Sequence, residues 1–232
     1  MTQLEIKTED GTAPAWEYGS GPSVLFFIDG IGMRPAMHEM AQRLAAAGYR
    51  VLMPDLFYRL GAYTAPDPAK LFGDPATRSA WFSRVMATTT ADKLLRDVPA
   101  YLALLGGKVG VTGYCMGGRM ALTAAAAFPD RIAAAAAYHP GGLVNDTPES
   151  PHLLVPKIKA SVYVGAATND QSFTDAQRAT FEAALSAAHV DHVVELYPAT
   201  HGWVPSDTPM HDAAQAERHW TTLLALFART LR

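Results

Sequence analysis

Cysteine is nearly absent from this chain of 232 residues, since Cys115 is the only one. An intrachain disulfide needs two thiols, so nothing in the chain indicates a small secreted fold held together by disulfides. A redox-sensor role is also disfavoured, because a sulfenic acid on Cys115 would find no second thiol in the chain to resolve it. The scarcity favours a role in which one thiol is sufficient.

The chain also lacks an excess of positive charge and any long apolar run. Its 19 Lys and Arg residues against 22 Asp and Glu residues give a formal net charge of −3. Nucleic-acid binding needs a basic face and is not expected. The opening MTQLEIKTEDG lacks the apolar region of a signal peptide, and no apolar stretch approaches the roughly 20 residues of a membrane span. We therefore expect a cytoplasmic protein that acts on a small molecule, as a monomer or a homodimer.

Short β-rich runs alternate along the chain with longer helical patterns. SVLFFI at 23–28 is almost continuously apolar, as in a strand covered on both faces. RPAMHEMAQRLAAAGY at 34–49 has apolar residues at helical spacing. This alternation predicts an α/β fold with a mostly parallel sheet and helices on both faces, in a single domain over 1–232. Further strands are expected at 50–54, 108–113, 132–139, 160–166 and 192–198, and further helices at 90–106, 115–128, 174–188 and 211–231.

Four segments are harder to interpret. The alanine-rich run at 132–139 favours a helix by composition, but its place in the alternation predicts a strand. Pro99 should disturb or begin part of the helix in which it falls. The segments 4–8 and 14–19 could form an antiparallel hairpin at the sheet edge. The weakly patterned segment 58–81, rich in Pro, Asp and Gly, is expected to cover a pocket.

The stretch VTGYCMGGRM at 111–120 places Cys115 between two glycines where a strand gives way to a helix. A sharp turn there would force Cys115 to a positive φ, and Gly113 and Gly117 would let neighbouring backbone pass close to it. The thiol would point above the strand ends, and the helix N-terminus would stabilise its anion. The alternative is a buried structural cysteine beside helix-packing glycines. The strand, the glycines and the helix together favour a nucleophile.

A nucleophile needs a base, and the base needs a group that orients it. His201 in YPATHGW follows the last expected strand, and Asp170 in VYVGAATND follows the strand before it. The order Cys115, Asp170, His201 matches that of α/β hydrolases. His201 could instead be a surface histidine, and Asp170 could be a loop or N-cap aspartate just before a helix. His139 follows a strand beside the nucleophile helix and stays an open candidate for the pocket. The other histidines are interpreted as surface, partly buried or junction residues without a credible metal site: His38, His152, His189, His192, His211 and His219.

With these motifs placed, the chain resembles the dienelactone hydrolase family of α/β hydrolases. The likeness runs from VLFFIDGIG through GYRVLMPDLFYR, GVTGYCMGGRMAL and GAATND to YPATHGW, and GYCMGG and PDLFYR are its most specific parts. The resemblance implies an α/β-hydrolase fold and a triad of Cys115, Asp170 and His201. It also implies hydrolysis of small esters or lactones through an acyl-enzyme, without a metal or organic cofactor. The backbone N–H groups of Met116 and Gly30 would form the oxyanion hole.

Two positions depart from the family pattern. Asp29 stands where the family's dienelactone enzymes carry a glutamate that contacts the resting cysteine and gates its activation. Pro205 stands where they carry an arginine for the substrate's carboxylate, and a second such arginine would fall near 78–84. Proline has no donor, so we expect a preference for neutral substrates. The same departures support an alternative from another class, a ligand-binding protein on this scaffold that turns over slowly or not at all. A panel of aryl esters and lactones would discriminate the two.

Overall fold

Eight strands form one sheet in the order β1-β2-β4-β3-β5-β6-β7-β8 in the computed structural model, which describes residues 1–231. The expected edge hairpin is confirmed, because β1 pairs with β2 in antiparallel fashion and β2 pairs likewise with β4. All other neighbouring strands are parallel. The strands are β1 Thr2–Thr8, β2 Gly11–Tyr18, β3 Ser23–Phe27, β4 Arg50–Pro54, β5 Val109–Tyr114, β6 Ile132–Tyr138, β7 Ser161–Ala167 and β8 His192–Tyr197.

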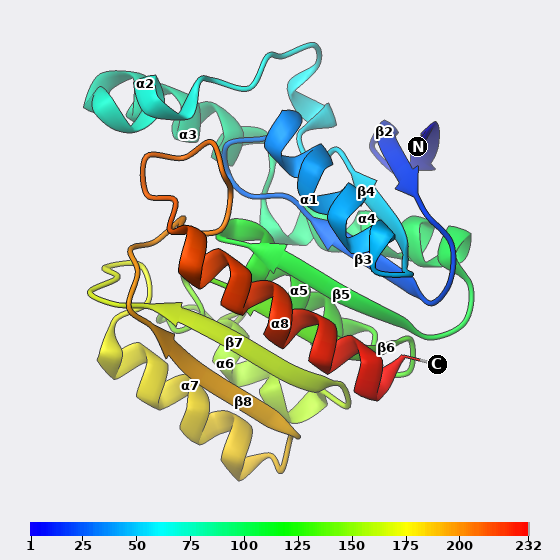
Figure 1. The fold of residues 1–232 in the computed structure, drawn as a ribbon, viewed down its shortest axis with the longest axis vertical. Helices are drawn as coiled ribbons and strands as arrows, with labels where there is room; N and C mark the ends of the chain where they lie inside the picture. Colours follow the sequence, from blue (N-terminus) through cyan, green and yellow to red (C-terminus); the bar gives the residue numbers. More distant parts are fainter. Residues whose placement is uncertain (232) are drawn as a thin grey trace.

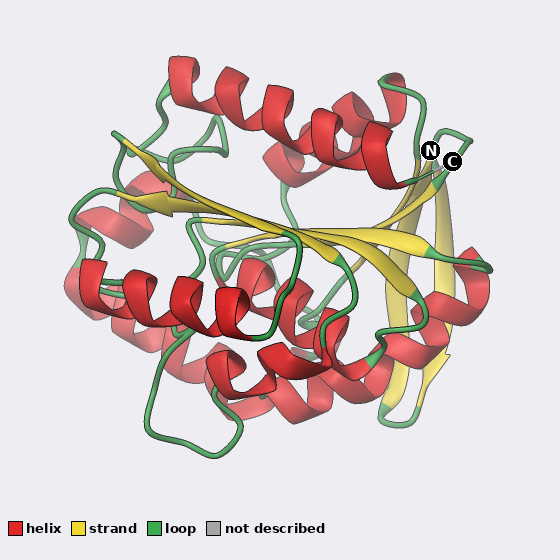
Figure 2. Cartoon of the chain, turned by 90° about the horizontal axis from the view of Figure 1, so that it is seen from below, coloured by secondary structure: helices red, strands yellow, loops and turns green. Residues whose placement is uncertain are grey.

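Helices cover both faces of this sheet, as the alternating pattern predicts. Helices α1 and α8 lie on one face, and α4, α5 and α7 lie on the other (Figures 1 and 2). The α-helices are α1 Pro35–Ala46, α2 Pro68–Gly73, α3 Pro75–Thr88, α4 Ala91–Leu105, α5 Met116–Ala127, α6 Pro151–Leu154, α7 Asp175–Ala187 and α8 Ala213–Thr230, and two short 3₁₀ turns are η1 Tyr58–Leu60 and η2 Val155–Lys157.

The alanine-rich run is a strand, so the prediction from its position in the chain is confirmed over the preference of alanine for helices. β6 lies between β5 and β7, and its residues Ala134–Ala137 are fully buried. Helices α5 and α8 pack against β6 from opposite faces. The small side chains let both helices approach the sheet closely, and this packing decides the structure of the run.

The expected break at Pro99 does not occur, because α4 continues through it. Pro99 lies on the exposed side of α4, between the buried residues Val98 and Tyr101. Proline removes one backbone hydrogen bond from a helix, and on the exposed side the freed carbonyl can bond to water. Burial of the opposite side of α4 then maintains the helix.

The weakly patterned segment contains η1 and α2 and runs into α3. Helices α2 and α3 lie over the carboxyl ends of the strands, beside the loop that follows β8 (Figure 1). Both helices have a proline in the first turn and an aspartate cap. Asp67 accepts a hydrogen bond from the backbone N–H of Lys70 at 2.9 Å, and Asp74 accepts one from Ala76 at 3.1 Å. Such caps start short helices without a strong apolar stripe, which is why apolar periodicity did not indicate them.

Within residues 1–231, no helix is both long enough and apolar enough to cross a membrane.

Candidate active site

The turn between β5 and α5 has the strained geometry expected of a nucleophile elbow. Cys115 has φ 55° and ψ −117°, and its N–H donates to the Tyr138 carbonyl oxygen at 3.0 Å. A Cβ on Gly113 would lie 2.1 Å from the carbonyl oxygen of Gly117, and a Cβ on Gly117 would lie 2.4 Å from that of Ile28. Neither distance is sterically possible, so both glycines are required for the turn.

His201 and Asp170 lie together, on the loops after β8 and β7. His201 Nδ1 is 2.7 Å from Asp170 Oδ2. Ser172, which the sequence did not single out, donates its hydroxyl to Asp170 Oδ1 at 2.6 Å and lies 3.2 Å from His201 Nδ1. Its backbone N–H also donates to Asp170 Oδ1 at 2.8 Å. The carboxylate is therefore fixed on one side by Ser172 and faces the imidazole on the other.

The charges of this site favour a protonated imidazole. Burial lowers the pKa of His201, but the Cys115 sulfur and the Asp170 carboxylate outweigh that effect and raise the pKa to about 10. Burial raises the pKa of Asp170, but its hydrogen bonds to His201 and Ser172 bring the pKa below the ordinary value. At neutral pH the imidazole is therefore protonated and faces the Asp170 carboxylate.

One small cavity brings together five residues singled out in the sequence: Asp29, Gly30, Cys115, His139 and His201. Its volume of about 30 Å³ is comparable to that of a single water molecule. Phe72 of α2 and Phe82 of α3 form part of its wall. An ester is larger than this space, and Cys115 and His201 are both partly exposed, so part of a substrate would lie outside the enclosed cavity. The whole lining is Asp29, Gly30, Ile31, Phe72, Phe82, Cys115, His139, His201, Gly202, Thr208 and Met210.

The loop after β3 reaches this cavity at Gly30. Gly30 lines the cavity, and its carbonyl oxygen accepts a 2.9 Å hydrogen bond from Trp81 Nε1 of α3. The N–H of Ile31 is occupied, because it donates to Asp29 Oδ1 at 2.9 Å. Among residues 1–231, the backbone N–H groups of Gly30 and Met116 have no hydrogen-bond partner. Both are therefore available to an oxyanion.

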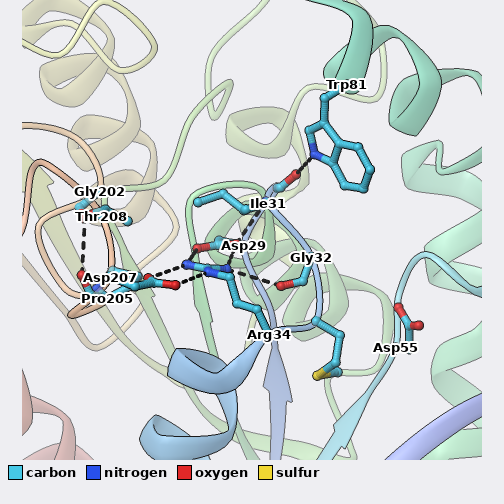
Figure 3. Close-up of polar contacts among 12 residues, drawn as sticks. Asp29, Ile31, Gly32, Arg34, Asp55, Trp81, Gly202, Pro205, Asp207 and Thr208 are labelled. Carbon is cyan, nitrogen blue, oxygen red and sulfur yellow. Dashed lines mark hydrogen bonds and ion pairs between the residues drawn. The ribbon is translucent and has the colours of Figure 1, made fainter. Parts of the chain in front are cut away.

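Asp29 lines the cavity, and its carboxylate is held by an arginine of its own loop. Arg34 donates Nη1 to Oδ1 at 2.7 Å and Nη2 to Oδ2 at 2.9 Å. The same guanidinium holds Asp207, with Nε to Oδ2 at 2.7 Å and Nη2 to Oδ1 at 3.1 Å. Figure 3 shows Arg34 between the two carboxylates. Arg34 therefore connects the loop after β3 to the loop after β8, across 173 residues of sequence.

Among residues 1–231, no arginine or lysine lines this cavity. Pro205 is buried in the loop that follows His201, and its carbonyl oxygen accepts a 3.3 Å hydrogen bond from the Thr208 hydroxyl. Arg78 and Arg84 are exposed on α3, while Arg59 is paired with Asp97 and Asp10.

The remaining histidines lie outside the cavity, and one interpretation was wrong. His219 was expected at or near the surface, but it is fully buried on the side of α8 that faces the sheet, with Nε2 2.9 Å from the Tyr114 hydroxyl. Burial lowers its pKa to about 3. Hydrogen bonds inside the core satisfy the polar atoms of His219. The residue type alone suggested exposure because it does not reveal such partners.

The sheet order, the positive-φ elbow and the aspartate–histidine pair beyond the strand ends define the α/β-hydrolase fold. The dienelactone hydrolase family model matches residues 12–231, so the chain belongs to that family and is a dienelactone hydrolase-like hydrolase. A protein of Salmonella typhi provisionally named a carboxymethylenebutenolidase is 29% identical over 220 residues, which cover 91% of this chain and 78% of that protein.

Solved structures share the fold at low sequence identity. A protein of Klebsiella pneumoniae subsp. pneumoniae MGH 78578, provisionally named a dienelactone hydrolase, superposes with a TM-score of 0.83 at 23% identity and 98% coverage of both chains. A dienelactone hydrolase-like promiscuous phosphotriesterase from metagenomic libraries gives 0.72 at 23% identity, over 100% of this chain and 99% of that one.

Proposed function

We propose that this protein hydrolyses small neutral esters or lactones with Cys115 as nucleophile, His201 as acid and base, and Asp170 as the residue that orients His201. One observation carries the proposal. A thiol on a strained elbow shares a cavity with an imidazole whose far nitrogen lies 2.7 Å from a buried carboxylate. The single hydrolase domain then needs no other nucleophile and no cofactor.

In the first half of the reaction, the sulfur of Cys115 attacks the substrate carbonyl and a C–S bond forms. The negative charge moves to the carbonyl oxygen, where the N–H groups of Met116 and Gly30 stabilise it. When the C–O bond breaks, the His201 imidazolium gives its proton to the leaving oxygen. An alcohol or enol departs and a thioester remains on Cys115.

In the second half, the now neutral His201 takes a proton from water as the water oxygen attacks the thioester. The C–S bond breaks, the acid product leaves and the sulfur returns as a thiolate beside the imidazolium. Asp170 stays ionised throughout and keeps Nδ1 of His201 protonated, so that Nε2 faces the reaction.

The cavity lining supports uncharged substrates. A carboxylate moved from water into this space would need a paired cation, and leaving it unpaired costs several kcal/mol. Arg34 lies nearby, but two carboxylates already occupy its donors. Asp29 at the cavity wall would repel a second anion.

The first test is the Cys115→Ala variant with p-nitrophenyl acetate. We expect hydrolysis to fall to the uncatalysed background while the melting temperature stays close to that of the unmodified protein. Turnover that persists in Cys115→Ala would contradict the triad. If neither protein turns over a panel of esters and lactones that the unmodified protein binds, the ligand-binding alternative replaces the proposal.

A further inference from the structure

His139 is a second histidine of the cavity and has no role in the steps above. It follows β6 directly, with φ 38°, and its backbone N–H donates to the Gly165 carbonyl oxygen at 2.8 Å. The residue is 1% exposed and lines the same cavity as Cys115. Its ring lies edge-on to His201 and Trp203, with centroids 5.0 Å and 4.9 Å away.

Neither ring nitrogen of His139 has a hydrogen-bond partner among residues 1–231. A buried polar atom without a partner costs on the order of 1–3 kcal/mol. His219 shows that this chain can satisfy a buried histidine, since both its ring nitrogens have partners, the Tyr114 hydroxyl and the Ala216 carbonyl oxygen. His139 is therefore an imidazole without a partner at the wall of the cavity that Cys115 lines.

The imidazole of His139 is neutral. Burial lowers its pKa well below the ordinary value, and the charges of His201 and His219 lower it further. A neutral imidazole offers one N–H donor and one acceptor nitrogen. It suits an uncharged oxygen and does not replace the missing arginine.

The sheet order indicates which part of a substrate lies near His139. β3 and β6 flank β5 on opposite sides, so the Gly30 loop and His139 lie on opposite sides of Cys115. The carbonyl oxygen belongs on the Gly30 side. The leaving oxygen belongs at Nε2 of His201, which protonates it. His139 lies on the same side of Cys115 as His201, with ring centroids 5.0 Å apart, so it neighbours the two remaining substituents, the leaving group and the acyl chain. Of these two, only the acyl chain stays in the site through both halves of the reaction.

We propose that His139 is a specificity residue that donates a hydrogen bond to a second, uncharged oxygen on the acyl chain of the substrate. The inference rests on the proposed function and narrows its substrates to esters or lactones with an ether, hydroxyl or keto oxygen near the reacting carbonyl. The discrimination is strong because a substrate without this oxygen leaves the buried nitrogen unsatisfied.

The test compares p-nitrophenyl methoxyacetate with p-nitrophenyl butyrate, whose acyl chains differ by an ether oxygen in place of a methylene. The ratio of their kcat/KM values is measured in the unmodified protein and in His139→Leu. Intrinsic reactivity cancels between the two proteins. We expect His139→Leu to lower this ratio tenfold or more and His139→Gln, which keeps an N–H donor, to restore part of it. An unchanged ratio in folded His139→Leu would overturn the inference.

Three controls separate the possible failures. His152→Leu removes a histidine that lies outside the cavity, and an equal loss of the ratio there would also contradict the inference. If His139→Leu does not fold, His139→Asn carries the same comparison, because asparagine tolerates the left-handed backbone. Cys115→Ala is assayed with both esters: activity that persists there contradicts the triad, whereas activity lost there with an unchanged ratio in the His139 variants contradicts only the role of His139.

Discussion

At the scale of single residues, the ionisation of His201 is the feature that distinguishes this site. An ordinary histidine has a pKa near 6.5, and here the neighbouring sulfur and carboxylate raise it to about 10. Because the folded pKa is the higher one, the charged pair contributes stability below pH 6.5, and this contribution is lost as the pH rises from 6.5 to about 10. In the proposed mechanism, this proton is the one that His201 gives to the leaving oxygen.

We predict that kcat/KM falls as the pH rises through about 10 and that Asp170→Asn shifts this descending limb to lower pH. The Asp170 carboxylate raises the pKa of His201, and an amide removes its charge. The pH profile of kcat/KM with an alkyl acetate, whose leaving oxygen needs the proton, checks the shift, and an NMR titration of His201 checks its origin. Asp175→Asn is the matched control, because Asp175 is exposed and pairs only with Arg178. A limb that stays in place in Asp170→Asn would contradict the assignment.

At the scale of elements, the loops after β3 and β8 hold the site together. Arg34 binds one carboxylate from each loop, and its side chain is 5% exposed. Trp81 of α3 adds a third connection through Gly30. Gly30 and the loop that carries His201 are thus positioned by one guanidinium and one indole, both distant from the thiol in sequence.

We predict that Arg34→Met lowers the free energy of unfolding by about 3–5 kcal/mol, since it leaves the buried carboxylate of Asp29 unpaired beside Asp207. Arg43→Met is the matched control. Arg43 also makes a bidentate pair, with Glu217, but the two side chains are 47% and 64% exposed. Exposed pairs contribute about 0–1 kcal/mol. Urea denaturation of both variants gives the comparison, and equal losses would show that Arg34 is not a buried clamp.

At the scale of the whole molecule, the sequence predicts the sheet and its nucleophile elbow well. Strand and helix periods are local, and their alternation decides even the alanine-rich β6. The glycines at 113 and 117 mark the elbow because only glycine permits those backbone approaches. Order along the chain then selects Asp170 and His201 as candidates.

What the sequence does not predict depends on contacts between distant segments. The pairing of Arg34 with Asp207 joins two loops whose approach is determined by the folded sheet, and no motif marks either residue. Ser172 looks like any loop serine until Asp170 is placed beside it. The two buried histidines are a further example. The ring nitrogens of His139 have no hydrogen-bond partner, whereas His219 bonds to the Tyr114 hydroxyl, and the sequence does not distinguish the two.

The charge of the substrate is a property of the whole cavity. The described part of the chain places no arginine or lysine in the lining and places Asp29 at its wall. We therefore predict that a neutral ester or lactone exceeds its carboxylate-bearing analogue in kcat/KM by tenfold or more, about 1.4 kcal/mol. A carboxylate and methyl ester pair, assayed at one ionic strength, measures this. A preference for the anion would mean that Arg78 or Arg84 reaches the site when the covering helices move.

The central claim is that Cys115 carries the acyl group between the two halves of the reaction. The most direct measurement is mass spectrometry of the protein quenched in acid during turnover of p-nitrophenyl acetate, followed by digestion and peptide mapping. We predict an acetyl group on the peptide that contains Cys115, increased in Asp170→Asn if deacylation is slowed, and absent in Cys115→Ala. Turnover without any acyl group on Cys115, or with one on another residue that persists in Cys115→Ala, would contradict the account.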